Sequence, residues 1–188
     1  MRDAGCRSQA ASDRMTTAYA RVLGAQITRL CPELQALHCA HGRFQGRITV
    51  SLSQNPLLRF GAGIAGFPRA TVDAPFVFST QSDGSCDIWV RQIGSTTMAS
   101  RLWVTDDGLL AEKMGTATAI SALHVTSDGG LVMQLKRFRV LGGPVPLTVA
   151  PKVSATESGQ GGYYRFDVAI GVPVFGVNLV RYAGQLAI

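Results

Sequence analysis

RFQGRITVSL, residues 43–52, carries the clearest structural signal in the sequence. Phe44, Ile48 and Val50 fall on one side of an extended chain, and polar residues occupy most of the positions between them. A hydrophobic period of two indicates a strand with one face buried and one face in water. We therefore predict a half-buried antiparallel strand here, and a sheet with its core on one side.

A helical arm is predicted before this strand. Apolar residues recur at helical spacing between Thr16 and Arg29, and Thr16 or Thr17 is a suitable N-cap. Pro32 interrupts the pattern and suits the first turn of a second, short helix through Leu37. We expect the two helices to form a bent arm that packs against the sheet.

Short alternating segments, separated by turn residues, follow from residue 72 to the end of the chain. The turns are SDGS at 82–85, DDG at 106–108, SDGG at 127–130, LGGP at 141–144 and SGQGG at 158–162. Turns of this type between alternating segments are the strongest local signal for β-hairpins. The glycine-containing segment LLRFGAGIAGFP, residues 57–68, disfavours a long helix, so we expect one or two helical turns or a loop there.

About ten strands joined mostly by short turns favour an antiparallel meander. Twist accumulates in a sheet of this length, so the sheet curls or closes. We predict an α+β fold, in which a strongly curved, mostly antiparallel sheet forms a half-barrel or barrel and carries an N-terminal helical arm. We expect residues 1–14 to be a flexible leader and residues 15–188 to form a single domain.

Composition and charge narrow the functional classes. The hydrophobic content of 46% and charged content of 16% are typical of a globular domain. No apolar run is long enough to span a bilayer, and the first fifteen residues lack the apolar core of a signal peptide. We therefore expect a cytoplasmic location, and Met15 is a possible native start.

The formal net charge is +6, and its cations are scattered apart from Lys136, Arg137 and Arg139. Nucleic-acid-binding modules usually gather basic and aromatic residues on one face, so we do not expect a nucleic-acid partner. The simplest interpretation is that the excess positive charge keeps the protein soluble. The alternatives are that it attracts an anionic ligand or an anionic membrane surface.

Histidines and cysteines do not form a convincing metal site. His38, Cys39 and His41 lie close together at the end of the helical arm, but no second cluster of ligands follows. We predict no metal, and we expect His38 to end its helix and pack on the sheet. The four cysteines at 6, 31, 39 and 86 form no CxxC pair, so we expect free buried thiols.

The concave face of a curled sheet has to be filled by side chains, by a helix or by a ligand. If their strand is regular, Arg137 and Arg139 share a face with Met133. These arginines then either reach water at the strand end or point into the concave face, where a buried charge needs a carboxylate partner or an anionic ligand.

Neighbouring strands offer carboxylates as partners for these cations. Glu112, Glu157 and Asp167 all lie in alternating segments. Asp167 falls on the side opposite an apolar set, so it belongs either to an exposed cross-strand ion pair or to a polar cluster with Arg139.

Five segments of the chain form a recognisable set. They are LHCAHGRFQGR (37–47), IWVRQIG (88–94), GGLVMQLKRFRVLGGPVPLTVAPKV (129–153), YYRFDVAIGVPVFG (163–176) and LVRYAGQL (179–186). The string R-x-R-x-L-G-x-P-x-P, followed by a strand, a Gly-rich turn and F-D-V, is the most specific part. The set resembles the bacterial domain of unknown function 4166 family, from about Tyr19 to the C-terminus.

This resemblance implies a fold more than an activity. Similar proteins can carry the domain after a saccharopine-dehydrogenase-like NAD-binding region, but no strand–GxGxxG–helix opens this chain. We therefore expect the stand-alone form, with no cofactor and no dehydrogenase chemistry. The closing motif of the family resembles L-V-H-Y-R-G-W-L, and Arg181, Ala183 and Gln185 replace three of its residues here, whereas His38 matches the Leu-His pair of the family.

We predict a non-enzymatic domain that binds an apolar or amphipathic, acid-headed small molecule in the concave face. The candidate ligand-binding residues are Arg91, Arg137, Arg139, Glu112, Asp167, Trp89, Phe76, Phe78, Phe166 and His38. Two other classes stay open. One is an isomerase-like or hydrolase-like enzyme that uses a carboxylate in the cleft, and the other is an interaction module that acts with a saccharopine-dehydrogenase-like, NAD-dependent partner.

Overall fold

The computed structural model describes residues 16–64, 66–173 and 176–188, so the expected leader at 1–14 and Met15 lie outside the described residues. The helical elements are α1 (Ala18–Leu23), the 3₁₀ helix η3 (Gly24–Arg29), α2 (Pro32–His38) and α3 (Pro56–Ile64). The strands are β1 (Arg43–Leu52), β2 (Thr71–Asp83), β3 (Cys86–Ile93), β4 (Thr96–Val104), β5 (Leu110–Met114), β6 (Ala117–Val125), β7 (Leu131–Val140), β8 (Gly143–Val145), β9 (Lys152–Gln160), β10 (Tyr163–Val172) and β11 (Val177–Ala187). The described chain is therefore mostly β.

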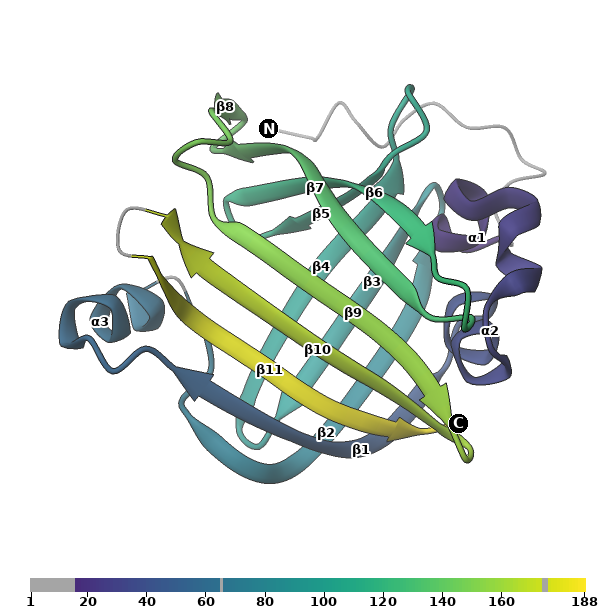
Figure 1. Cartoon of the computed structure of the whole chain (residues 1–188), viewed down its shortest axis with the longest axis horizontal. Helices are drawn as coiled ribbons and strands as arrows, with labels where there is room; N and C mark the ends of the chain where they lie inside the picture. The colour runs from purple at the N-terminus through teal and green to yellow at the C-terminus, as the bar shows by residue number, and fades with distance from the viewer. Residues whose placement is uncertain (1–15, 65, 174–175) are drawn as a thin grey trace.

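The sheet closes on itself into a barrel (Figure 1). Its order is β6-β5-β4-β3-β2-β1-β11-β10-β9-β7-β8, and β6 also pairs with β7. Ten strands thus form a continuous antiparallel ring, and β8 is a short addition at the edge of β7. The prediction of a strongly curved, barrel-like antiparallel sheet of about ten strands is confirmed.

Alternation along the strands builds the core. In β1 the inward-facing Ile48 and Val50 are each 2% exposed, as the sequence pattern predicted. Register shifts interrupt the ladders at three places: beside Ile48 in the β1–β2 pair, beside Ile120 in the β6–β7 pair and beside Ile170 in the β10–β11 pair. Bulges of this kind bend strands and increase their twist, which helps a sheet to close.

The helical arm covers one end of the barrel, which we call the helical end (Figure 1). The side chain of Thr17 accepts a hydrogen bond from the amide of Ala20, and Pro32 starts α2, as predicted. Tyr19 and Leu37 are buried against the strands. The arm differs from the prediction in one respect, because residues 24–29 form a 3₁₀ helix instead of continuing α1.

The opposite end of the barrel carries α3 and β8, and we call it the mouth (Figure 1). Its described connecting residues are 53–64, 66–70, 94–95, 115–116, 141–151, 173 and 176. Helix α3 spans nine residues, and the side chain of Asn55 accepts hydrogen bonds from the amides of Leu57 and Leu58 at its start. In the described part of the chain, no helix has the length and apolar character that a membrane span requires.

The cysteines differ from the expectation of free buried thiols. Cys31 and Cys39 are free, but Cys31 is half-buried and Cys39 is exposed. Cys86 is buried and disulfide-bonded. Cys6 lies outside the described residues.

Candidate functional site

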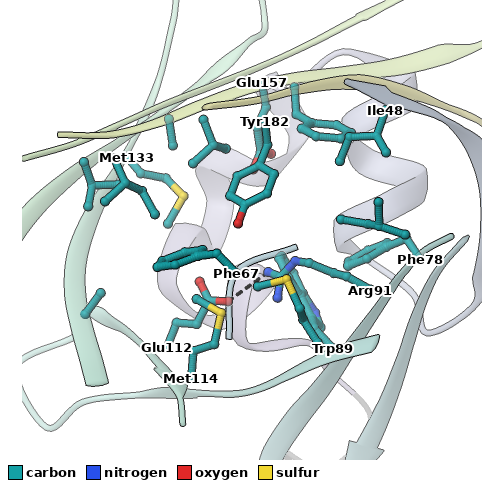
Figure 2. A pocket seen from close by; sticks show the side chains of 18 of the residues that line it. Ile48, Phe67, Phe78, Trp89, Arg91, Glu112, Met114, Met133, Glu157 and Tyr182 are labelled. Atoms are coloured by element: carbon teal, nitrogen blue, oxygen red, sulfur yellow. Dashed lines mark hydrogen bonds and ion pairs between the residues drawn. The ribbon is translucent and has the colours of Figure 1, made fainter. Parts of the chain in front are cut away.

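The barrel encloses a cavity of about 250 Å³. Its walls are inward-facing side chains of the strands together with Tyr19 and Leu37 from the helical arm and Phe67 from the segment after α3. These walls are mostly apolar, and the charged groups among the lining residues are Arg91, Glu112 and Glu157. Figure 2 shows the side chains converging on this space from both sides of the barrel.

Burial of the lining residues shows which end of the cavity is sealed. At the helical end the inward-facing Tyr19, Leu37 and Leu186 are at most 2% exposed. Toward the mouth, inward-facing residues of several strands are only half-buried, and they include Met98, Met114, Phe138, Val153 and Ile170. Because side chains that point inward still meet solvent there, the cavity opens at the mouth.

An ion pair lies along one wall of the cavity, between β3 and β5. Nη2 of Arg91 lies 2.8 Å from Oε1 of Glu112, and Nη1 of Arg91 donates a 2.8 Å hydrogen bond to Oγ of Ser100 (Figure 2). The guanidinium also lies 5.3 Å from the ring centroid of Trp89 and 5.9 Å from that of Phe78. Its charge is therefore balanced by one carboxylate and supported by two aromatic faces.

The hydroxyl of Tyr182 is the unsatisfied polar group of the cavity wall. It is buried and has no hydrogen-bond partner among the described residues. Figure 2 shows it pointing into the cavity, and the ring of Phe67 packs at a centroid distance of 6.4 Å. Burial raises the pKa of the Tyr182 hydroxyl, although the nearby Arg91 opposes the effect, so the group stays protonated and can donate a hydrogen bond.

A second polar cluster lies where α2 meets the barrel. Nε2 of His38 is 2.6 Å from Oε2 of Glu157, and the hydroxyl of Tyr164 hydrogen-bonds the same carboxylate. The ring of Tyr19 stacks on His38 at a centroid distance of 4.0 Å. Burial raises the pKa of both tyrosines, with the Glu157 charge as the next cause, so both hydroxyls remain protonated.

The structure brings most of the candidate residues from the sequence together. The lining residues among them are Phe76, Phe78, Trp89, Arg91, Glu112 and Phe166. His38 does not line the cavity, but it holds Glu157, which does. It also ends α2 and packs on the sheet, as the sequence predicted.

Arg137, Arg139 and Asp167 lie outside the cavity. In the ladder between β6 and β7, Ile120 pairs with Arg137 and the next residue, Ser121, pairs with Leu135. Lys136 therefore has no partner on β6 and forms a bulge. This bulge reverses the alternation after Met133, and it turns Phe138 inward and both arginines outward. The placement of the arginines on the Met133 face, which a regular strand would give, is therefore wrong.

These outward-facing charges lie on the barrel surface. Arg137 forms an ion pair with Asp107 at 2.8 Å, and its side chain is 45% exposed. Asp167 pairs with Arg181 on the neighbouring strand β11, and the side chains are 39% and 55% exposed. Arg139 is exposed beside β8, opposite Pro144.

Sequence reasoning missed several residues of the cavity wall. Tyr182 shares its face of β11 with the buried Val180 and Leu186, so the alternation of LVRYAGQL contained the signal. Phe67 and Tyr19 come from a loop and a helix, and no periodicity links them to the sheet.

The histidines and carboxylates of the described residues do not form a metal centre. No group of three or more potential His, Cys, Asp or Glu ligands comes together in the described ranges. His41 instead lies 2.9 Å from Oδ1 of Asp87, and His124 is exposed on β6.

Comparison with known proteins gives one match. A family model described as "Domain of unknown function (DUF4166)" matches residues 30–186, which include α2 and all of the barrel except the last residue of β11. No match is found among curated proteins.

Proposed function

We propose, from the premise that this chain belongs to the DUF4166 family, that it is a non-enzymatic domain that binds one apolar or amphipathic small molecule inside its barrel. The family carries no assigned activity, so the proposal rests on one observation. An apolar cavity opens at the mouth, and the polar groups of Arg91, Glu112 and Tyr182 converge inside it. Apolar walls with a few convergent polar groups are typical of small-molecule sites.

The size of the cavity favours a slender ligand. Its volume of about 250 Å³ lies just below the range of roughly 300–1,000 Å³ of ordinary ligand pockets. A single alkyl chain fits such a space better than a broad polycyclic molecule. Each Å² of apolar ligand surface removed from water contributes about 25 cal/mol to binding, so length along the barrel raises affinity.

The polar groups specify the other part of the ligand. Arg91 already donates to Glu112 and Ser100, and three of its five N–H donors remain for a ligand oxygen. Tyr182 offers a further donor. A hydroxyl or carbonyl oxygen between these groups would satisfy both.

An acidic head group, which the sequence suggested, fits this arrangement less well. Glu112 already neutralises Arg91, so a carboxylate at the same place would bring a second negative charge beside Glu112. Like charges in a partly desolvated site repel strongly. We therefore propose that the barrel prefers a neutral polar end group to an ionised one.

Glu157 supports a second candidate function, an isomerase-like or hydrolase-like enzyme. Its carboxylate reaches the cavity wall and is held by His38 and Tyr164, an arrangement that could position a general base. The two candidates differ in the fate of the bound molecule, because a binder releases it unchanged and an enzyme converts it.

Native mass spectrometry of freshly purified protein, with displacement of the neutral, rod-shaped fluorophore 1,6-diphenyl-1,3,5-hexatriene, tests the proposal. We expect a retained small molecule or saturable fluorophore binding that decanol displaces. Ala119 lines the cavity and Ala99 is exposed on β4, so Ala119→Phe should abolish binding while Ala99→Phe leaves it intact.

Equal binding by both variants would overturn the proposal, because the fluorophore would then not be inside the barrel. Recovery of a displaced ligand in a chemically altered form would favour the enzyme instead.

A further inference from the structure

We propose that the mouth of the barrel docks on an anionic lipid bilayer. The large apolar side chains that the described residues expose are concentrated there. Those at the mouth are Leu57, Phe60, Val72, Val140, Leu141, Leu147, Val149 and Val177. Tyr163 and Ile188 are the corresponding residues at the helical end. Exposed apolar groups gathered at one end of a molecule mark a contact surface.

Helix α3 presents two of these side chains together. Leu57 and Phe60 are 76% and 72% exposed and lie one helical turn apart, so they share a face. Ala62 is buried on the other side, where α3 contacts β11. Figure 1 shows α3 standing at the edge of the barrel. Its apolar face is therefore available to a partner outside the barrel.

The segment around β8 presents further exposed apolar side chains of the mouth. Leu141 is 82% exposed at a φ of +52°, a conformation that Gly or Asn adopts far more readily than Leu. Its amide donates a hydrogen bond to the carbonyl of Thr116, which fixes the turn. Leu147 and Val149 follow in the same segment and are about half exposed.

Charge at the mouth matches an anionic surface. The mouth segments contain Arg59 and Arg69 and no Asp or Glu. Arg139 and Lys152 are exposed beside them at the ends of β7 and β9. The carboxylate of Asp73, at the start of β2, is held by Arg47.

The helical end carries charges of both signs. The carboxylates of Glu33, Asp83, Asp106, Asp107 and Asp128 lie in α2, at a strand end and in turns, and the cations of Arg21, Arg29 and Arg43 lie in the helical arm and at the start of β1. An anionic membrane attracts cations within about a Debye length and repels carboxylates. The mouth segments, which contain cations and no Asp or Glu, therefore face the lipid.

The relation of the mouth to the cavity favours a bilayer over a protein partner. The apolar side chains stand on separate segments around an opening, and Phe67, which packs beside Tyr182, lines the cavity just inside. An apolar molecule could pass between lipid and cavity without crossing water. Apolar side chains with flanking cations are also the composition by which peripheral proteins enter the headgroup region.

Flotation with vesicles tests this inference. We expect the ligand-free protein to float with vesicles that contain 30 mol% phosphatidylglycerol, but not with pure phosphatidylcholine vesicles, and high salt should weaken the binding. The double variant Leu57→Ser/Phe60→Ser should reduce the bound fraction at least tenfold. Ile188→Ser, which removes an exposed apolar side chain at the helical end, should bind like the parent.

Three results would overturn the inference: no flotation of the parent protein, equal flotation with neutral vesicles, or equal loss in the Ile188→Ser control. Self-association that Leu57→Ser/Phe60→Ser abolishes, without vesicle binding, would identify a second copy as the occupant and also overturn it. Fluorophore binding without vesicles is measured on the same variants, so failure of lipid docking is distinguishable from failure of the proposed ligand site.

Discussion

Nε2 of His38, the last residue of α2, lies 2.6 Å from Oε2 of Glu157 on β9. The two side chains are 0% and 6% exposed, so this contact joins the helical arm to the barrel in a buried site. Removal of one partner leaves the other buried without its hydrogen bond, and this is more costly than the contact itself is favourable.

Glu157→Ala or His38→Ala should therefore lower the free energy of unfolding by about 3–5 kcal/mol. Urea denaturation of the parent protein and the variants at pH 7 measures this loss. Asp167→Asn, which breaks the exposed pair with Arg181, is the matched control and should cost under about 1 kcal/mol. Equal losses in all three variants would contradict the structural role of the His38 contact.

Two tyrosines should respond in opposite ways to loss of the hydroxyl. Tyr182→Phe removes an unsatisfied buried group and should raise the free energy of unfolding by about 1 kcal/mol. Tyr164→Phe removes a donor to Glu157 and should lower it by about 1–2 kcal/mol. Thermal unfolding without ligand compares them, and a destabilised Tyr182→Phe variant would mean that its hydroxyl is satisfied in solution.

Glu112→Gln should reverse the preference for the end group of the ligand. We expect the parent protein to bind decanol more tightly than decanoate, because Glu112 already neutralises Arg91. In the variant the freed guanidinium should improve decanoate binding by about tenfold or more. Isothermal titration with both ligands measures this, with Glu33→Gln on the outer surface of α2 as the control. Unchanged decanoate affinity would place the head group elsewhere.

Gly46→Ala should destabilise the barrel strongly. A Cβ atom at Gly46 would lie 1.8 Å from the carbonyl oxygen of Gln185, in the ladder between β1 and β11. Separating these backbones should cost roughly 3 kcal/mol or more. Gly61→Ala in α3, where a Cβ meets nothing within 4 Å, should instead be neutral or stabilise by about 0.5–1 kcal/mol. Equal melting temperatures would contradict this close approach.

Acid should weaken the fold through its surface carboxylates. The hydrogen bonds from Arg181 lower the pKa of Asp167 in the folded state. A group with a depressed folded pKa stabilises the fold above its unfolded pKa of about 4, and this contribution is lost as the pH falls through the folded value. The urea concentration at the unfolding midpoint should therefore decrease as the pH is lowered below about 4. This decrease should be less steep in Asp167→Asn. Arg181→Gln should reproduce that shallower slope, and an unchanged slope would contradict the ion pair.

The alternation of apolar and polar residues was sufficient to predict the strands and part of the candidate site. Phe76, Phe78, Trp89 and Arg91 are adjacent in the hairpin of β2 and β3, so alternation alone predicted that they meet. Closure depends instead on the pairing of β1 with β11, which are far apart in the sequence, and the sequence left the choice between half-barrel and barrel open.

The bulge at Lys136 shows why the sequence could not fix the direction of Arg137 and Arg139. A single unpaired residue reverses the facing of every later side chain in a strand, and only the partner strand reveals it. KRFRV contains no Gly or Pro to announce the shift. The sequence therefore left open whether Arg137 and Arg139 face water or the interior, until the ladder with β6 fixed their direction.

The pairing of β1 with β11 also constrains biosynthesis. The first strand of the ring finds one of its neighbours only after residues 177–187 have emerged from the ribosome. Until then the nascent sheet has two unsatisfied borders, which can recruit other extended chains. Closure by such distant contacts is slow, so chaperone holding during translation should determine how much of this protein reaches its native state.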